Sequence, residues 1–136
     1  MRIIILGAGL QGNIVLTDLM DKELSPDKKQ VKILNRTEAK ARQVAAQFEG
    51  VEYAALDIIN HTKFVEEIKG YDVVVNCTQY DNNIRVMNAC LEAGCNYIDL
   101  GGLFHVTKEQ FKLHDAFLKK GLTAILGMGS TAGESA

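Results

Sequence analysis

The sequence contains 136 residues, of which 47% are hydrophobic and 24% are charged, and its formal net charge is −2. This length suits one domain with one hydrophobic core, and the small net charge gives no electrostatic attraction to nucleic acid or to an anionic membrane. The apolar start, Ile3-Ile4-Ile5-Leu6, stops at Gly7 and is too short for a signal peptide or a membrane-spanning helix. We therefore expect a cytoplasmic protein without nucleic-acid or membrane partners.

The three cysteines show no metal-ligand spacing, and pairing two of them would leave the third unpaired. We expect Cys77, Cys90 and Cys95 to be reduced and buried as small apolar side chains. We expect no bound metal.

The first half of the chain alternates short apolar runs with helical patterns. Strands are predicted at 2–6, 31–34 and 51–55, helices at 10–20 and 38–47, and a short helix or turn at 62–68. Thr37 stands where it can cap the second helix, and Gly50 lies just beyond the end of that helix.

The second half continues this alternation. The run Val73-Val74-Val75 marks a predicted strand at 72–76 as fully buried. Asp81 is expected to cap a helix that ends at Gly94. The apolar face of that helix is predicted from residues spaced three and four apart: Ile84, Met87 and Leu91.

The last predicted elements are a strand at 96–98, a helix and a strand at 122–126. Thr107 and Gln110 form a capping-box pair that opens the helix, which stops at Gly121. Six strands separated by helices predict an α/β fold with a doubly wound, six-stranded parallel sheet between two helical layers. This is the complement of a Rossmann domain, with expected strand order 3-2-1-4-5-6, over residues 1–136.

A glycine pattern of the form G-x-G-x-x-G lies between the first strand and the first helix. A strand before it, a helix after it and a second strand ending about 20 residues on are the context that supports a dinucleotide-binding loop. The exposed N–H groups and the helix dipole of such a loop favour phosphate. The expected phosphate-binding residues are Gly7, Gly9, Leu10, Gln11 and Gly12.

The residues after the second strand predict which nicotinamide cofactor binds. NAD-binding domains usually have an acidic residue here, whereas this chain has Asn35-Arg36-Thr37, which resembles the NADP-selecting turn of shikimate dehydrogenases. Asparagine removes the charge that would repel a 2′-phosphate, and Arg36 can offer a guanidinium to its oxygens. Thr37 adds a hydroxyl and Lys40 a second positive charge. NADP is therefore favoured over NAD, the alternative being a solvated helix start with less specific NAD binding.

Residues after the third and fourth strands complete the predicted cofactor site. Asp57 stands where related dinucleotide-binding domains contact the adenine, with Ile58 as an apolar wall, or it is a loop carboxylate that caps the next helical turn. Asn76, Cys77 and Thr78 should line the nicotinamide-ribose end, because ligands bind at the switch point of such sheets. Cys77 is expected to be a small wall residue rather than a nucleophile.

Two longer stretches resemble the cofactor domain of the saccharopine dehydrogenase/saccharopine reductase family, which includes lysine 6-dehydrogenase-like proteins. The stretches are Val74-Val75-Asn76-Cys77-Thr78 and Tyr97-Ile98-Asp99-Leu100-Gly101-Gly102-Leu103-Phe104-His105, supported by the glycine loop and by Leu122 to Ser130. The resemblance implies a two-domain oxidoreductase that transfers a hydride at a C–N bond of an amino-acid substrate.

The same resemblance implies that the chain is an N-terminal fragment, with the substrate domain and most catalytic residues elsewhere, and inactive alone. It leaves a homodimer open. Family members often carry a proline where Ala132 stands, and fungal-type members tend to have an acidic residue where Thr131 stands. These departures put saccharopine itself in doubt as the substrate.

Asp99 and His105 flank the loop after the fifth strand and could form an acid/base pair. The favoured interpretation is that Asp99 binds loop amides and His105 packs at a domain junction, while His61 and His114 are solvated. A regulatory nucleotide-sensing Rossmann module is the alternative function, although such modules generally keep the acidic residue after the second strand. A third alternative is an interaction protein that retains the fold and has lost its ligand.

Overall fold

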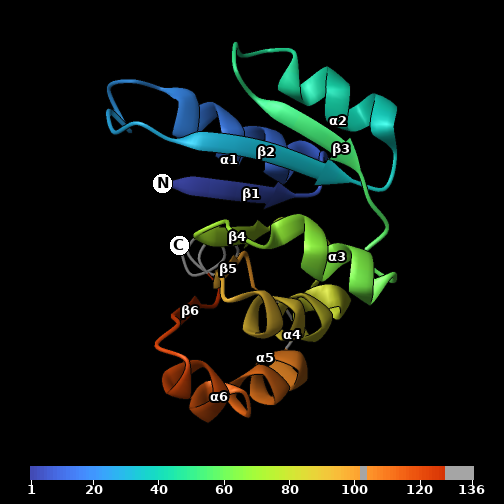
Figure 1. The fold of residues 1–136 in the computed structure, drawn as a ribbon, viewed down its shortest axis with the longest axis vertical. Helices are drawn as coiled ribbons and strands as arrows, with labels where there is room; N and C mark the ends of the chain where they lie inside the picture. Colours follow the sequence, from blue (N-terminus) through green and yellow to red (C-terminus); the bar gives the residue numbers. More distant parts are fainter. Residues whose placement is uncertain (102–103, 128–136) are drawn as a thin grey trace.

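The computed structural model describes residues 1–101 and 104–127. It contains one six-stranded parallel sheet of order β3-β2-β1-β4-β5-β6 (Figure 1). The strands are β1 (Arg2–Leu6), β2 (Gln30–Asn35), β3 (Glu52–Ala55), β4 (Val73–Asn76), β5 (Asn96–Asp99) and β6 (Ala124–Ile125). The helices are α1 (Leu10–Met20), α2 (Glu38–Ala45), α3 (His61–Ile68), the 3-10 helix η1 (Tyr80–Asn82), α4 (Asn83–Ala93), α5 (Phe104–Phe111) and α6 (His114–Lys119). The predicted fold and strand order are confirmed.

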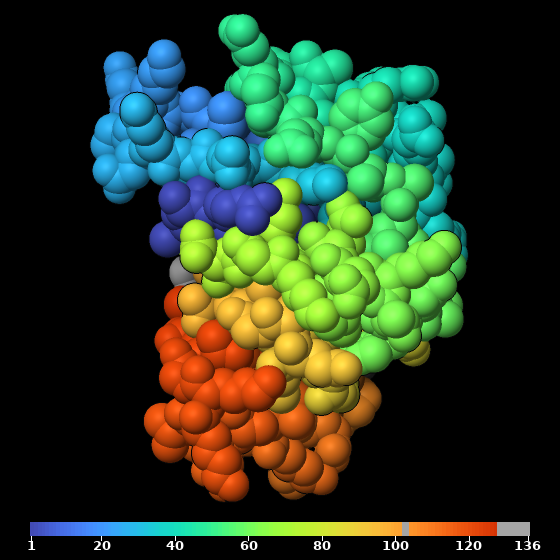
Figure 2. Space-filling view, in the orientation of Figure 1, coloured from blue at the N-terminus to red at the C-terminus, as the bar shows by residue number. Residues whose placement is uncertain are grey.

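Alternating side chains of β1 separate two hydrophobic cores, as expected for a strand buried on both faces. Ile3 and Ile5 belong to the core that includes Leu16 of α1 and residues of α2. Ile4 and Leu6 belong to the other core, which is built with α3, α4 and α6. The sheet is therefore the middle of three layers. In the space-filling view the residues of β1 (dark blue) lie between lighter blue and yellow-green regions of the chain (Figure 2).

The region before α4 differs from the prediction. Asp81 does not cap α4, because it lies inside η1 and the N-cap residue of α4 is Asn82. The buried face of α4 is also shifted: Met87 is buried as predicted, but Ile84 and Leu91 are only partly buried. The buried positions include Asn83, which its polar side chain would predict to be exposed. Its amide is buried and hydrogen-bonded to Asn76.

The helix predicted from Thr107 to Gly121 is two helices, α5 and α6. Thr107 and Gln110 do not form a capping box, because both lie within α5 and Gln110 is buried. Short backbone bonds of the i→i−3 type, from Lys112 to Glu109 and from Leu113 to Gln110, end α5 before α6 begins. Thr37 is the N-cap residue of α2 as expected, but its side chain makes no capping bond.

The other predicted boundaries hold within one or two residues at each end, with α2 and β6 shorter than predicted. Cys90 and Cys95 are free and buried as predicted, whereas Cys77 is partly exposed. Among the described residues, no helix is long and apolar enough to cross a membrane. Gly102, Leu103 and residues 128–136, which include Gly129, Ser130, Thr131 and Ala132 of the family resemblance, lie outside the described residues.

Candidate cofactor-binding site

A cleft of about 420 Å³ lies at the carboxyl ends of the first strands of the sheet. The segments that line it follow β1, β2, β3 and β4, which is where ligands bind in open parallel sheets. The predicted residues among its walls are Gly7, Gly9, Asn35, Arg36, Asp57, Ile58, Cys77 and Thr78. We call this space the cofactor cleft.

The glycine loop at the base of the cleft has no room for side chains at two positions. Gly7 has φ +104°, and a Cβ there would lie 3.1 Å from the carbonyl oxygen of Cys77. A Cβ on Gly12 would lie 2.1 Å from the carbonyl oxygen of Gly7, so only glycine lets α1 approach the loop this closely. Gly12 is buried and does not line the cleft. Gly12 thus serves the packing of α1 on the loop and is not a wall of the cleft.

The first turn of α1 lies beside the cleft. Its N-cap residue Gly9 provides no side-chain cap, and there is no acidic residue in the first turn. Apart from its neighbours in the chain, no atom of the described residues lies within 4 Å of the place where a Cβ of Gly9 would stand, so the backbone is open to a ligand there. Leu10 and Gln11 are exposed on this turn and do not line the cleft. The first N–H groups of a helix have no intrahelical partner and favour anions.

Asn35 connects the glycine loop to the turn after β2. Its Oδ1 accepts a hydrogen bond from the Ala8 N–H at 3.1 Å, and its Nδ2 donates to the Thr37 carbonyl at 3.0 Å. An aspartate could accept the first bond but could not donate the second. Both ends of the amide are therefore used to hold the two loops together.

The cations near Asn35 are available to a ligand. Arg36 is exposed and lines the cleft, and Lys40 is exposed on α2. Neither has an ion-pair partner in residues 1–101 and 104–127. Thr37 is exposed but does not line the cleft, and its carbonyl is the group that contacts Asn35.

Asp57 has a structural contact and also faces the cleft. Its Oδ1 accepts a hydrogen bond from the N–H of Ile59 at 3.1 Å, while α3 is capped by Asn60 through the N–H of Lys63. Asp57 therefore holds the loop before α3 without capping the helix. Ile58 is a partly buried wall that packs on the core, and an adenine contact by either residue stays a prediction.

Of the last residue of β4 and the two residues that follow it, two line the cleft. Cys77 is a wall residue, and burial raises the pKa of its thiol to about 12, so the thiol stays protonated near neutral pH. Thr78 stands beside it. Asn76 was predicted to line the cleft, and this prediction is wrong. Its side chain is buried and makes hydrogen bonds with Thr78, Asn83 and Tyr97.

Several residues of the cleft were not predicted. They are Leu6, Ala8, Leu34, Leu56, Ile59, Gln79 and Asn82. Most of them are sequence neighbours of predicted residues at strand ends. Leu56 and Ile59 flank Asp57 and Ile58, and their apolar side chains could have been used to predict them as walls of the cleft. Gln79 and Asn82 reach the cleft because η1 follows β4, and the sequence pattern did not indicate η1.

Asp99 is buried behind the cleft and does not pair with His105. Its carboxylate accepts hydrogen bonds from the N–H groups of Gly101 and Gly127 at 2.9 and 2.8 Å. His105 is exposed on α5, and no hydrogen bond or ion pair between the two is found among the described residues. The interpretation of Asp99 as a ligand of loop amides is confirmed. His61 is not simply solvated, since its Nε2 pairs with Glu92.

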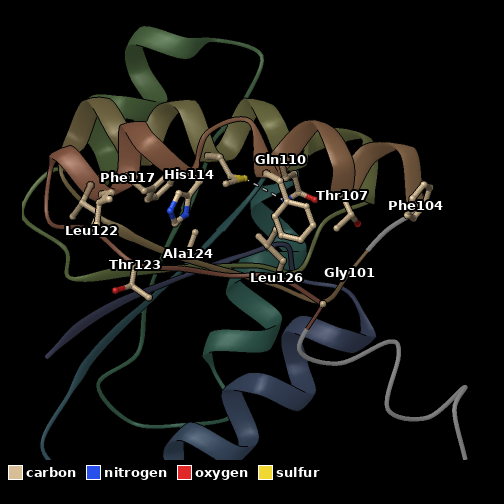
Figure 3. A pocket seen from close by; sticks show the side chains of 14 residues that line it. Gly101, Phe104, Thr107, Gln110, His114, Phe117, Leu122, Thr123, Ala124 and Leu126 are labelled. Atoms are coloured by element: carbon tan, nitrogen blue, oxygen red, sulfur yellow. Dashed lines mark hydrogen bonds between the residues drawn. The ribbon is translucent and has the colours of Figure 1, made fainter.

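A second cavity, of about 620 Å³, lies between the helices α5 and α6 and the strand β6 (Figure 3). Most of its walls are apolar side chains, including Phe104, Phe111, Phe117 and Leu126. No sequence pattern indicated this cavity. Its polar walls are Thr107, Gln110, His114 and Thr123, and Gly101 and Gly127 also line it.

Comparisons with known proteins identify the fold and the family. The model of the saccharopine dehydrogenase NADP binding domain matches residues 3–125. Carboxyaminopropylagmatine dehydrogenase from Synechocystis sp. is 30% identical, with 97% of this chain and 35% of the relative covered. The chain thus spans about a third of the length of this curated relative.

Solved structures agree on the fold. Saccharopine dehydrogenase (L-Glu forming) from Saccharomyces cerevisiae has a TM-score of 0.77 at 20% identity, covering 94% of this chain and 27% of that one. An NADPH-dependent quinone oxidoreductase from Escherichia coli, complexed with NADPH, has a TM-score of 0.65 at 22% identity, covering 91% and 47%. The predicted resemblance is confirmed, and the preference for NADP agrees with the family's cofactor. The chain belongs to the saccharopine dehydrogenase NADP-binding domain family.

Proposed function

We propose that this chain binds NADP(H) in the cofactor cleft and is the cofactor domain of an oxidoreductase that acts on a C–N bond of an amino-acid substrate. The observation that carries the cofactor proposal is the Asn35 bridge, with Arg36 beside it, which has no ion-pair partner among the described residues. The matching relatives are dehydrogenases of saccharopine and of carboxyaminopropylagmatine by name, which supports the substrate class.

The glycine loop fits a pyrophosphate. The open space at Gly9 is where phosphate oxygens can approach the backbone, and the uncapped first turn of α1 supplies N–H groups and the positive end of the helix dipole. In the described part of the chain, no acidic side chain lies in that turn to compete with a phosphate.

The turn after β2 fits a 2′-phosphate better than a free ribose. A carboxylate in place of Asn35 would repel the phosphate, and it would lose the bond to the Thr37 carbonyl that positions the turn. Arg36 is exposed and lines the cleft, so its guanidinium can approach phosphate oxygens. Lys40 adds charge from the first turn of α2.

When bound, the nicotinamide supplies or accepts the hydride, while the protein binds and orients it. Cys77 contributes an apolar wall of the cleft. Its thiol stays protonated and is therefore a poor nucleophile. We infer that a further domain binds the substrate, that these residues alone catalyse no turnover, and that a homodimer is compatible with the domain.

Calorimetric titration with NADPH and with NADH tests the cofactor proposal. Arg36→Gln should weaken NADPH binding by about 10- to 100-fold, which is the loss of one charge-assisted hydrogen bond, and should leave NADH binding unchanged. Asn35→Asp should weaken NADPH binding and shift the preference toward NADH.

Arg42→Gln is the matched control, because Arg42 is exposed on α2 and does not line the cleft. It should bind NADPH as the wild type does. An Arg36→Gln variant that loses no more NADPH affinity than this control would contradict the proposed 2′-phosphate contact. Absence of binding to either cofactor in the full-length protein would contradict the proposal as a whole.

A further inference from the structure

Five buried polar side chains form a closed hydrogen-bonded ring behind the cofactor cleft. They come from β4, α4, β5 and α5, and each is at most 2% exposed. In order around the ring they are Asn76, Asn83, Gln110, Asp99 and Tyr97. Among the described residues, every buried side-chain nitrogen and oxygen has a partner.

The carboxylate of Asp99 fixes the direction of every bond in this ring. This carboxylate accepts every hydrogen bond found for it, from the N–H groups of Gly101 and Gly127 and from Tyr97, so Gln110 presents Nε2 to it, at 2.7 Å. The Gln110 Oε1 then faces the Nδ2 of Asn83 at 3.4 Å, and the Oδ1 of Asn83 faces the Nδ2 of Asn76 at 2.9 Å.

The second branch of the ring has the same direction. Burial raises the pKa of Tyr97 far above its ordinary value, so its hydroxyl stays protonated. This hydroxyl donates a hydrogen bond to Asp99 at 2.7 Å. The same oxygen accepts from the Nδ2 of Asn76 at 3.2 Å. Both branches therefore require Asn76 to turn its amide nitrogen toward the ring.

This orientation determines what Thr78 offers in the cleft. The Oδ1 of Asn76 faces outward and accepts from the N–H of Thr78 at 3.1 Å and from its hydroxyl at 2.5 Å. The hydroxyl proton is thus committed to Asn76. The remaining lone pairs of the Thr78 oxygen can only accept a hydrogen bond, from a ligand group such as a ribose hydroxyl or a carboxamide N–H.

We propose that Asp99 is a positioning residue for the cofactor cleft, which it does not touch, and that it acts through the ring to hold Thr78 as a hydrogen-bond acceptor toward the cofactor. This inference rests on the proposed NADPH binding. In Asp99→Asn the amide can donate as well as accept, so the ring can also run in the opposite direction, with the amide nitrogen of Asn76 turned toward the N–H of Thr78.

A double-mutant cycle on NADPH affinity tests the inference. Asp99→Asn and Thr78→Val should each weaken binding by roughly five- to tenfold, a typical coupling between sites. The double variant should be no weaker than Thr78→Val alone, because Asp99 acts through Thr78. Thr78→Ser should restore the affinity. Additive effects in the double variant would overturn the inference.

Ile68→Ala is the stability control, since Ile68 is buried at the end of α3 and lines neither cavity. It should unfold more readily than the wild type and bind NADPH equally well. Tyr97→Phe opens one branch of the ring only, so it should lose less NADPH affinity than Asp99→Asn. It takes the place of Asp99→Asn in the test if that variant does not fold. An Asp99→Asn or Tyr97→Phe variant that binds NADPH as tightly as Ile68→Ala would contradict the inference.

Amide hydrogen exchange without cofactor separates a failure of this inference from a failure of the proposed function. Exchange at the Thr78 N–H should be faster in Asp99→Asn than in Ile68→Ala. Unchanged exchange at Thr78 overturns the role of the ring, whether or not the wild type binds NADPH. Faster exchange in a protein that binds no NADPH would support the ring and refute the cofactor proposal.

Discussion

The cofactor cleft and the second cavity differ in how their walls are made. The walls of the cofactor cleft combine backbone and polar groups at strand ends, including Gly9, Asn35 and Arg36, with apolar side chains such as Leu56. The second cavity is surrounded mainly by apolar side chains of α5, α6 and β6, such as Phe111 and Phe117. The first arises from short local segments and offers directed hydrogen bonds, whereas the second depends on how helices pack and offers apolar surface.

The largest expected effect separates two phenylalanines of the second cavity. Phe117 is 3% exposed and Phe111 is 65% exposed. Phe117→Ala should lower the free energy of unfolding by about 3–5 kcal/mol because it leaves a void in the core, whereas Phe111→Ala should change it by less than about 0.5 kcal/mol. Urea unfolding measures both, and equal losses would show that the cavity wall is one packed unit.

A smaller effect should separate two glycines of the cofactor cleft. Gly12→Ala forces a Cβ against the Gly7 carbonyl, and overpacking of this kind costs about 1–3 kcal/mol of unfolding free energy. Gly9→Ala places its Cβ in open space, so it should unfold like the wild type and yet bind NADPH less tightly. Thermal unfolding with calorimetric titration tests the pair, and a destabilised Gly9→Ala variant would refute the open-loop description.

The smallest effect concerns the thiol in the wall of the cleft. The pKa of Cys77 is about 12 in the folded protein against an ordinary value of 9.0. Below pH 9 the thiol is protonated in both states, and as the pH rises above 9 the unfolded state loses the proton first. Cys77 should therefore cost about 1.4 kcal/mol of stability by pH 10. Cys77→Ala should show a shallower loss between pH 8 and pH 10, and an unchanged slope would contradict the raised pKa.

Most of the fold and much of the cleft could be predicted from the sequence. Runs such as Ile3 to Leu6 and the glycine loop are continuous in sequence, and in a parallel sheet the residues that follow each strand meet at one edge. Asn35 and Asp57 were placed in this way. What could not be predicted was the partner of each side chain, such as the Thr37 carbonyl for Asn35.

The errors concern polar residues with distant partners. Gln110 fits a capping box by spacing, but its side chain is bonded to Asp99, eleven residues earlier in sequence. Asn83 is polar by composition and buried because Asn76 and Gln110 satisfy its amide. Local periodicity has no information on such pairs, because they exist only after β4, β5 and α5 have packed together.

The position of β1 has a consequence for synthesis of the chain. β1 lies between β2 and β4, and its residue Ile3 pairs with Val31 on one side and with Val73 on the other. One edge of β1 can thus pair as soon as β2 is made, whereas the other must wait for about 40 further residues. At about 5–20 residues per second, the ribosome leaves this apolar edge unpaired for roughly 2–8 s, a period in which a chaperone or a neighbouring chain can bind it.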